Sequence, residues 1–148
     1  MTAYKTIVVG TDGSATANMA VERAGAVAAD CQAALFVVCA YQVREHPSAE
    51  AEHALGQDAW MVTGSAPAES VVRDAASRAY AMGAYDVQTM VVKGAPIGVL
   101  DDAVTSLGAD LLVVGNVGLN TLTGRILGSV PQNVARRSGV DVLIVHTS

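Results

Sequence analysis

The chain has 148 residues, of which 51% are hydrophobic and only 4% aromatic, and its formal net charge is −5. This length is typical of a single domain, residues 1–148, and the high hydrophobicity excludes an intrinsically disordered chain. The negative charge argues against non-specific binding to nucleic acid, which requires a basic surface.

Nothing in the sequence predicts a secretion signal or a membrane span. Residues 1–5 lead directly into a strand, and no apolar run approaches the roughly 20 residues that a bilayer requires. Cys31 and Cys39 match neither a metal spacing nor a C-x-x-C motif, so we expect two reduced, packed thiols. We therefore expect a soluble cytoplasmic protein that does not bind membranes.

In chain order, the first expected elements are a strand at 7–9 and a helix that Ser14 caps and that runs to about Ala29. A second strand follows at 35–38. The polar connection from 41 to 64 is unusually long, so it is either a surface excursion or a lid over a ligand.

Three further strands are expected at 87–92, 111–114 and 142–145, and the helices between strands have Pro67, Pro96 and Pro131 in their first turns. The helix from Pro67 ends near Gly83. Four of the five strand runs are continuously apolar, as in a parallel sheet buried on both faces, whereas 87–92 is mixed and is the best candidate for an edge strand. This alternation predicts an α/β fold: a doubly wound, Rossmann-like parallel sheet with helices on both faces.

Glycine-rich turns follow the first and fourth strands. Gly10 precedes the turn 11–14, and the segment 115–118 is followed, after nine residues, by Gly128 and Ser129. In doubly wound sheets, ligands bind beyond the carboxyl ends of strands where the strand order reverses. Glycine N–H groups and the start of the helix at Pro131 would suit a phosphate, and plain turns are the alternative interpretation.

Two charged residues near these turns have alternative roles. Asp12 either caps the helix after Ser14, or it binds a ribose hydroxyl or supports Mg²⁺ beside a polyphosphate. The segment 111–140 contains no Asp or Glu, so an anion could dock there. Within it, Arg125 either pairs with a phosphate or is simply solvated.

The second turn has the pattern G-x-x-G, then nine residues, then G-S. This spacing resembles the nucleotide-binding signature of the ATP-binding branch of the universal stress protein family. The turns at 12–14 and 94–96 and the terminal strand at 140–145 are also similar to that family, so the resemblance covers essentially the whole chain. It implies a five-stranded sheet of order 3-2-1-4-5, an adenine-nucleotide ligand and a homodimer.

Carried over by position, the resemblance gives roles to residues at the strand ends. Thr11 and Asp12 would face the ribose or the phosphates, the backbone of Ala40 would hold the adenine, and Gly94 would form a wall. The complete expected nucleotide site is Gly10, Thr11, Asp12, Ala40, Gly94, Gly115, Asn116, Gly118, Arg125, Gly128, Ser129 and Val130.

The terminal strand would lie at an edge of such a sheet, and it carries no lysine or proline that would prevent pairing with another chain. We predict that it pairs antiparallel with its copy across a two-fold axis, although loops of the same chain could cover it instead. The expected interface residues are Val140, Val142, Leu143, Ile144 and Val145.

Three functions fit these features. The sequence has no P-loop lysine and no nucleophile elbow, and Asp12 is the only carboxylate in the expected site, so no catalytic residue is assigned and enzyme activity is left open. The leading hypothesis is a homodimeric regulatory, stress-response protein that binds ATP or cyclic AMP. The alternatives are a slow Mg²⁺-dependent nucleotide hydrolase or phosphotransferase that uses Asp12, and a dimerisation module whose crevice binds nothing.

Overall fold

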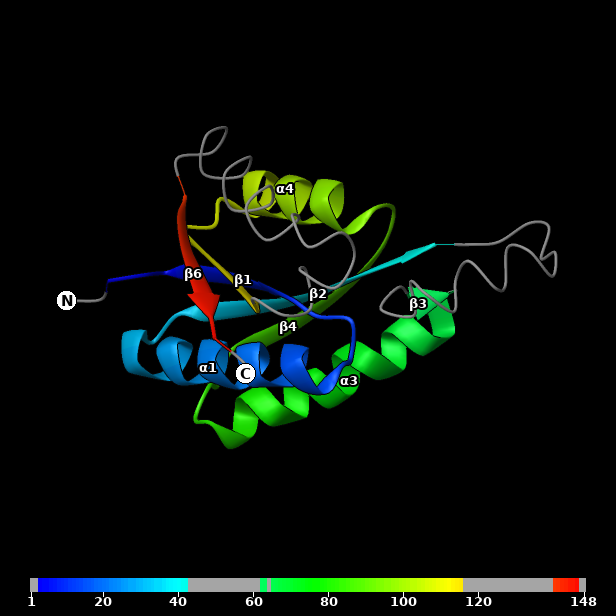
Figure 1. Ribbon diagram of the computed structural model, residues 1–148. Helices are drawn as coiled ribbons and strands as arrows, with labels where there is room; N and C mark the ends of the chain where they lie inside the picture. Colours follow the sequence, from blue (N-terminus) through cyan, green and yellow to red (C-terminus); the bar gives the residue numbers. More distant parts are fainter. Residues whose placement is uncertain (1–2, 43–61, 64, 116–139, 147–148) are drawn as a thin grey trace, which may run out of the picture.

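The computed structural model describes residues 3–42, 62–63, 65–115 and 140–146. A parallel β-sheet lies between two helical layers (Figure 1). Its strands are β1 (Thr6–Gly10), β2 (Ala34–Gln42), β3 (Val62–Thr63), β4 (Val87–Lys93), β5 (Leu111–Gly115) and β6 (Asp141–Val145). The helices are α1 (Ala15–Cys31), α3 (Ser65–Ala81) and α4 (Pro96–Leu107).

The strand order confirms the predicted topology. The five longer strands lie in the order β4-β2-β1-β5-β6, which is 3-2-1-4-5 when they are counted along the chain. The two-residue strand β3 pairs with the end of β2 at Tyr41 and Gln42 and was not predicted. Two residues are too few to show the alternation by which a strand is recognised in a sequence.

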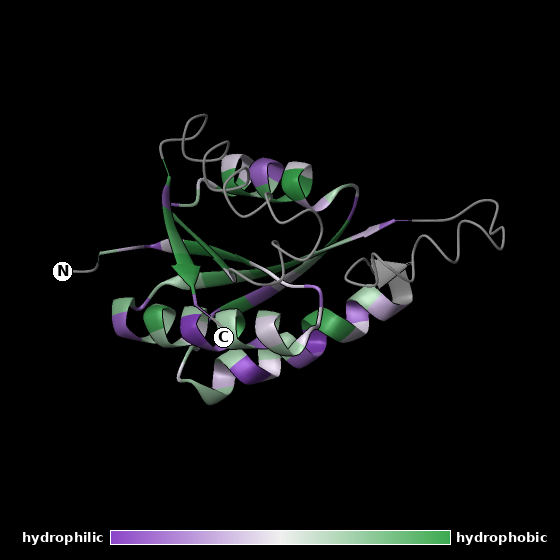
Figure 2. Ribbon diagram, in the orientation of Figure 1, coloured by the Kyte–Doolittle hydropathy of each residue, from purple (hydrophilic) through white to green (hydrophobic). Residues whose placement is uncertain are grey.

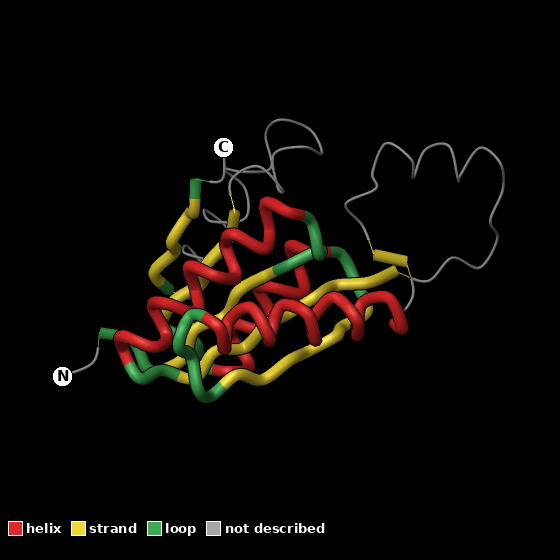
Figure 3. Tube along the Cα trace, turned by 90° about the horizontal axis from the view of Figure 1, so that it is seen from below, coloured by secondary structure: helices red, strands yellow, loops and turns green. Residues whose placement is uncertain are grey.

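The two faces of the sheet pack against different helices. α1 and α3 cover one face, and α4 lies on the other (Figures 1 and 3). Alternate residues of each strand therefore enter two separate apolar clusters: Val9 and Val37 face α1 and α3, whereas Val8 and Val38 face α4. Figure 2 shows the central strands as almost continuously hydrophobic, which explains why their sequences lack a polar alternation.

The helix boundaries agree with the sequence signals. Ser14 is the N-cap of α1, and its side chain accepts a hydrogen bond from the backbone N–H of Ala17 at 3.1 Å. Pro96 begins α4, and Gly108 ends it in the left-handed conformation. The helix predicted from Pro131 lies outside the described residues.

The small residues of α1 allow it to pack closely against the sheet and α3. Ala17, Ala20, Ala24 and Ala28 recur at helical spacing and are buried. Gly25 faces α3 so closely that a Cβ atom there would lie 2.9 Å from the backbone of Ala79. The alanine-rich composition therefore sets short distances between the layers.

The two edges of the sheet are the strands β4 and β6. Among the described residues, β4 pairs only with β2, so the mixed strand is an edge strand as predicted. β6 pairs with β5 at the opposite edge, and its residues 142–144 are only half-buried, less than their continuous apolar run suggested. No helix in the described part of the chain is both long enough and apolar enough to span a bilayer.

Candidate functional site

A pocket opens at the carboxyl ends of the central strands. The ends of β1, β2 and β5 meet there. In the sheet, β1 has β2 on one side and β5 on the other. This is the point at which the strand order reverses, where doubly wound sheets bind ligands. The topology thus places the glycine that ends β1, Gly10, and the glycine that ends β5, Gly115, in the lining of one pocket.

The lining of the pocket is mainly apolar. Besides residues of the strand ends and of the turn after β1, three residues of α4 contribute to it. The lining residues are Gly10, Thr11, Asp12, Ala17, Val38, Ala40, Pro96, Val99, Leu100, Val114 and Gly115. The pocket measures about 620 Å³, a volume that includes space open to solvent. Asp12 is the only ionisable group among these residues.

Side-chain hydrogen bonds fix the turn that carries Asp12. The hydroxyl of Thr11 accepts from the backbone N–H of Gly13 at 3.1 Å, and Oδ1 of Asp12 accepts from the N–H of Ser14 at 2.9 Å. The N–H of Thr11 donates to the carbonyl of Val38 at 3.0 Å, which ties the turn to β2. Asp12 therefore supports the turn before α1 as the structural interpretation suggested, although the N-cap itself is Ser14. Among the described residues, no group donates to its second oxygen, Oδ2.

Two glycines bring α4 close to the strand ends. A Cβ atom on Gly10 would lie 3.0 Å from the side chain of Leu100, so any larger residue at this position would require that side chain to shift. Gly94 has a φ of +145°, and its N–H donates to the carbonyl of Tyr41 at 2.9 Å. This left-handed conformation, which favours glycine, turns the chain from β4 into α4.

The structure brings five of the predicted site residues together in the pocket: Gly10, Thr11, Asp12, Ala40 and Gly115. Gly94 does not line the pocket, but it lies two residues before Pro96, which is a lining residue. Asn116, Gly118, Arg125, Gly128, Ser129 and Val130 lie outside the described residues. Their roles, like those of the other site residues, remain predictions.

The sequence reasoning missed the apolar part of the lining. Val38 and Val114 belong to runs that were recognised only as buried strands, and Val99 and Leu100 belong to a helix that was given no role in the site. Their contribution depends on where α4 crosses the sheet, and a single sequence does not specify that crossing. The only available signal was the position of Pro96, which starts a helix at the site end of β4.

Metal binding has little support within the described part of the chain, where no group of three or more His, Cys, Asp or Glu side chains could hold an ion. At the pocket, Asp12 offers one carboxylate oxygen to which no described residue donates a hydrogen bond. It could contribute a single ligand to a Mg²⁺ ion whose other ligands come from a polyphosphate and water.

Comparisons with known proteins agree with the geometry. "Universal stress protein Rv1636" of Mycobacterium tuberculosis (strain H37Rv) is 49% identical over 148 residues, which cover both chains completely. A crystal structure of a universal stress protein in complex with cAMP aligns with a TM-score of 0.75 and 48% identity, covering 99% of this chain and 100% of that one. The crystal structure of protein Rv1636 aligns with a TM-score of 0.62 and 43% identity over 100% and 99% of the two chains.

The profile of the universal stress protein family matches residues 3–146, almost the entire chain. The sheet order, the apolar pocket at the reversal of that order and the glycine-ended strands agree with this match. The chain belongs to the universal stress protein family.

Proposed function

We propose that this protein is a regulatory, stress-response protein that binds an adenine nucleotide in the pocket at the ends of β1, β2 and β5. The observation that carries the proposal is the pocket itself, which combines an apolar lining with one carboxylate and two glycine-ended strands. The similar structure in complex with cAMP supports the choice of ligand class.

The chemistry of the lining suggests how the nucleotide lies. The apolar side chains of Val38, Val99 and Leu100 suit a flat purine base, and the backbone of Ala40 offers polar groups at the edge of that base. The carboxylate of Asp12 suits a hydrogen bond from a sugar hydroxyl and repels a phosphate. The phosphate would therefore lie toward Gly115 and the residues that follow it, whose glycines and Ser129 supply N–H and hydroxyl donors.

We propose cyclic AMP or ATP as the ligand, with Mg²⁺ accompanying ATP. Binding without fast chemistry is supported by the described residues of the lining, among which Asp12 is the only group that could act as a base, and one of its oxygens already accepts from Ser14. We further propose that the protein acts as a cytoplasmic homodimer, with nucleotide binding altering partner binding. The two free cysteines, Cys31 and Cys39, support a reducing compartment.

Calorimetry with cyclic AMP and with ATP tests the site. We expect the wild-type protein to bind, and a Gly128→Ala, Ser129→Ala double variant to bind at least about tenfold more weakly, because it loses a donor and the close approach of the phosphate. Ser77→Ala, on an exposed position of α3, is the matched control and should bind like the wild type. Mass spectrometry after incubation with ATP and Mg²⁺ should recover the nucleotide intact.

Full affinity in the double variant would remove the phosphate site from the glycine-rich segment. Rapid conversion of ATP to ADP by the wild type, lost in Asp12→Asn, would replace the binding function with a hydrolase. A wild-type protein that binds neither nucleotide would contradict the proposal as a whole.

A further inference from the structure

The turn between β1 and α1 is held by more bonds than a tight turn requires. Thr11 is 8% exposed and uses both its N–H and its hydroxyl, toward Val38 and Gly13 respectively. Gly13 has a φ of +83°, and a Cβ atom there would lie 2.9 Å from the side chain of Val71 in α3. The turn is therefore tied to β2 on one side, and on the other side α3 leaves no room for a side chain at residue 13.

We propose that Thr11 is a positioning residue for Asp12: its hydroxyl holds the turn in the conformation that directs the free carboxylate oxygen of Asp12 toward a sugar hydroxyl of the ligand. This inference rests on the proposed function, and it gives Thr11 a different role from the ligand contact that the family resemblance implied.

Asp12 depends on Thr11 because the two residues support consecutive parts of one turn. The Thr11 hydroxyl accepts from Gly13, and the Asp12 carboxylate accepts from Ser14, the next residue. If the Thr11–Gly13 bond is removed, Gly13 can rotate, and its rotation moves the N–H of Ser14 to which Oδ1 of Asp12 is bonded. Because Oδ1 of Asp12 moves together with the N–H of Ser14, the other carboxylate oxygen, Oδ2, changes its position within the pocket.

The substitution that isolates this role is Thr11→Val, which keeps the branched shape of the side chain but cannot accept a hydrogen bond. Thr11→Ser keeps the acceptor and is the matched control. Both are compared with the wild type by calorimetry with cyclic AMP, and melting temperatures are recorded for each. If Thr11→Val does not fold, Thr11→Ala removes the same acceptor without a branched side chain.

We expect Thr11→Val to bind cyclic AMP about three- to tenfold more weakly, which is the effect of losing one hydrogen bond, and Thr11→Ser to bind within about twofold of the wild type. The decisive measurement is a double-mutant cycle with Asp12→Ala, because a residue that acts through Asp12 has no effect once Asp12 is absent. 2′-Deoxy cyclic AMP lacks the sugar hydroxyl and should likewise bind equally well to the wild type and to Thr11→Val.

Three outcomes separate the possibilities. Unchanged affinity of Thr11→Val for cyclic AMP, with a wild type that binds, overturns the inference and leaves the proposed function intact. A loss that persists in full in the Asp12→Ala background and with the 2′-deoxy ligand also overturns it, because Thr11 then contacts the ligand directly or acts on the whole fold. A wild type that binds neither cyclic AMP nor ATP overturns the proposed function, and the inference with it.

Discussion

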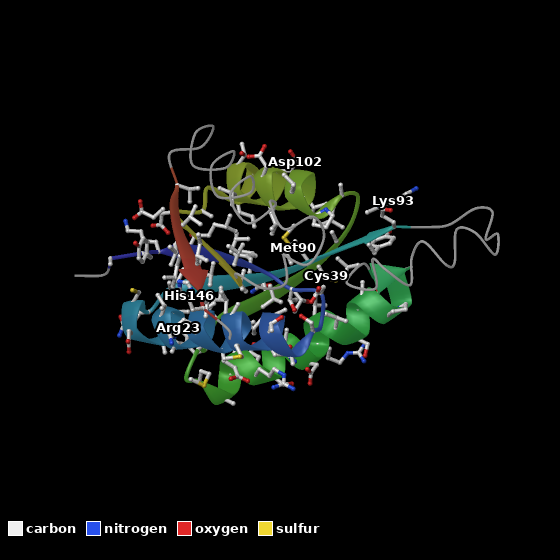
Figure 4. All side chains as sticks on the ribbon, viewed as in Figure 1. Arg23, Cys39, Met90, Lys93, Asp102 and His146 are labelled. Carbon is white, nitrogen blue, oxygen red and sulfur yellow. The ribbon has the colours of Figure 1, made fainter. Side chains whose placement is uncertain are left out.

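The thiol of Cys39 is buried within the second half of β2 (Figure 4). Burial, together with the nearby negative charge of Asp12, raises the pKa of this thiol to about 11. At pH 8 only on the order of one thiol in a thousand is then ionised, and the thiolate is the reactive form. We therefore expect Cys39 to act as a packing residue and to resist oxidation and alkylation in the folded protein.

Thiol labelling at pH 8 checks this interpretation. We expect Cys31, which is only partly buried at the end of α1, to react first, and Cys39 to react only when the protein unfolds. The raised pKa also makes the free energy of unfolding depend on pH. The stabilisation from the neutral Cys39 thiol is complete below the unfolded pKa of about 9, and it is lost as the pH rises toward 11. Cys39→Ala should remove this loss of stability at alkaline pH. Equal labelling rates for both cysteines in the native protein would contradict the prediction.

Among the elements, the contact between α1 and α3 depends most on a single small residue. Gly25 lies where the two helices approach, and the nearest atoms to an added Cβ would be backbone atoms of Ala79, which cannot move independently of the helix. An ion pair between Arg78 of α3 and Glu22 of α1, 3.1 Å apart, lies at the solvent side of the same contact, and Arg78 also pairs with Asp74. Because these side chains are partly exposed, the ion pairs add little, and close packing is the main stabilising factor.

We therefore expect Gly25→Ala to lower the free energy of unfolding by about 1–2 kcal/mol, because overpacking outweighs the gain in helix propensity. Gly98→Ala in α4 is the matched control, since a Cβ atom there would meet no atom of the described residues within 4 Å. That variant should raise the stability by about 0.5–1 kcal/mol, because the unfolded chain loses freedom. Urea titration measures both values, and a stabilising Gly25→Ala would show that the helices can separate at little cost.

At the level of the whole molecule, β6 leaves an incompletely covered apolar edge. Val142, Leu143 and Ile144 are half-buried, whereas Val140 and Val145 are buried by their own chain. Within the described residues no strand pairs with the outer side of β6. An apolar edge without lysine favours pairing with another chain, so we propose that β6 pairs with its copy across a two-fold axis.

Sedimentation of Val142→Lys tests this dimer. We expect the wild type to sediment as a dimer and the variant as a monomer, because the interface would bury one lysine from each protomer, and burial of an unpaired charge is unfavourable. Thr89→Lys, on the exposed opposite edge strand β4, is the control and should remain dimeric. Circular dichroism verifies that both variants fold. A folded Val142→Lys dimer would assign the interface to another surface.

The sequence determined the elements and their class because the signals for them are local. Apolar runs marked all five longer strands, and Ser14, Pro96 and Pro67 marked the starts of the helices within about a residue or two. The turn after β1 was recognisable for the same reason: glycine and aspartate at a strand end need no distant partner to form it. The strand order came only from the family resemblance, and the structure confirms it.

Tertiary structure decided everything that depends on two segments meeting. The close approaches of Leu100 to Gly10 and of Val71 to Gly13, and the hydrogen bond from Thr11 to Val38, join residues of different elements. These contacts bring two glycine-ended strands together at one pocket and hold the turn that contains Asp12. Local patterns cannot specify them, because the distance between packed elements depends on the combined volumes of all the side chains between them.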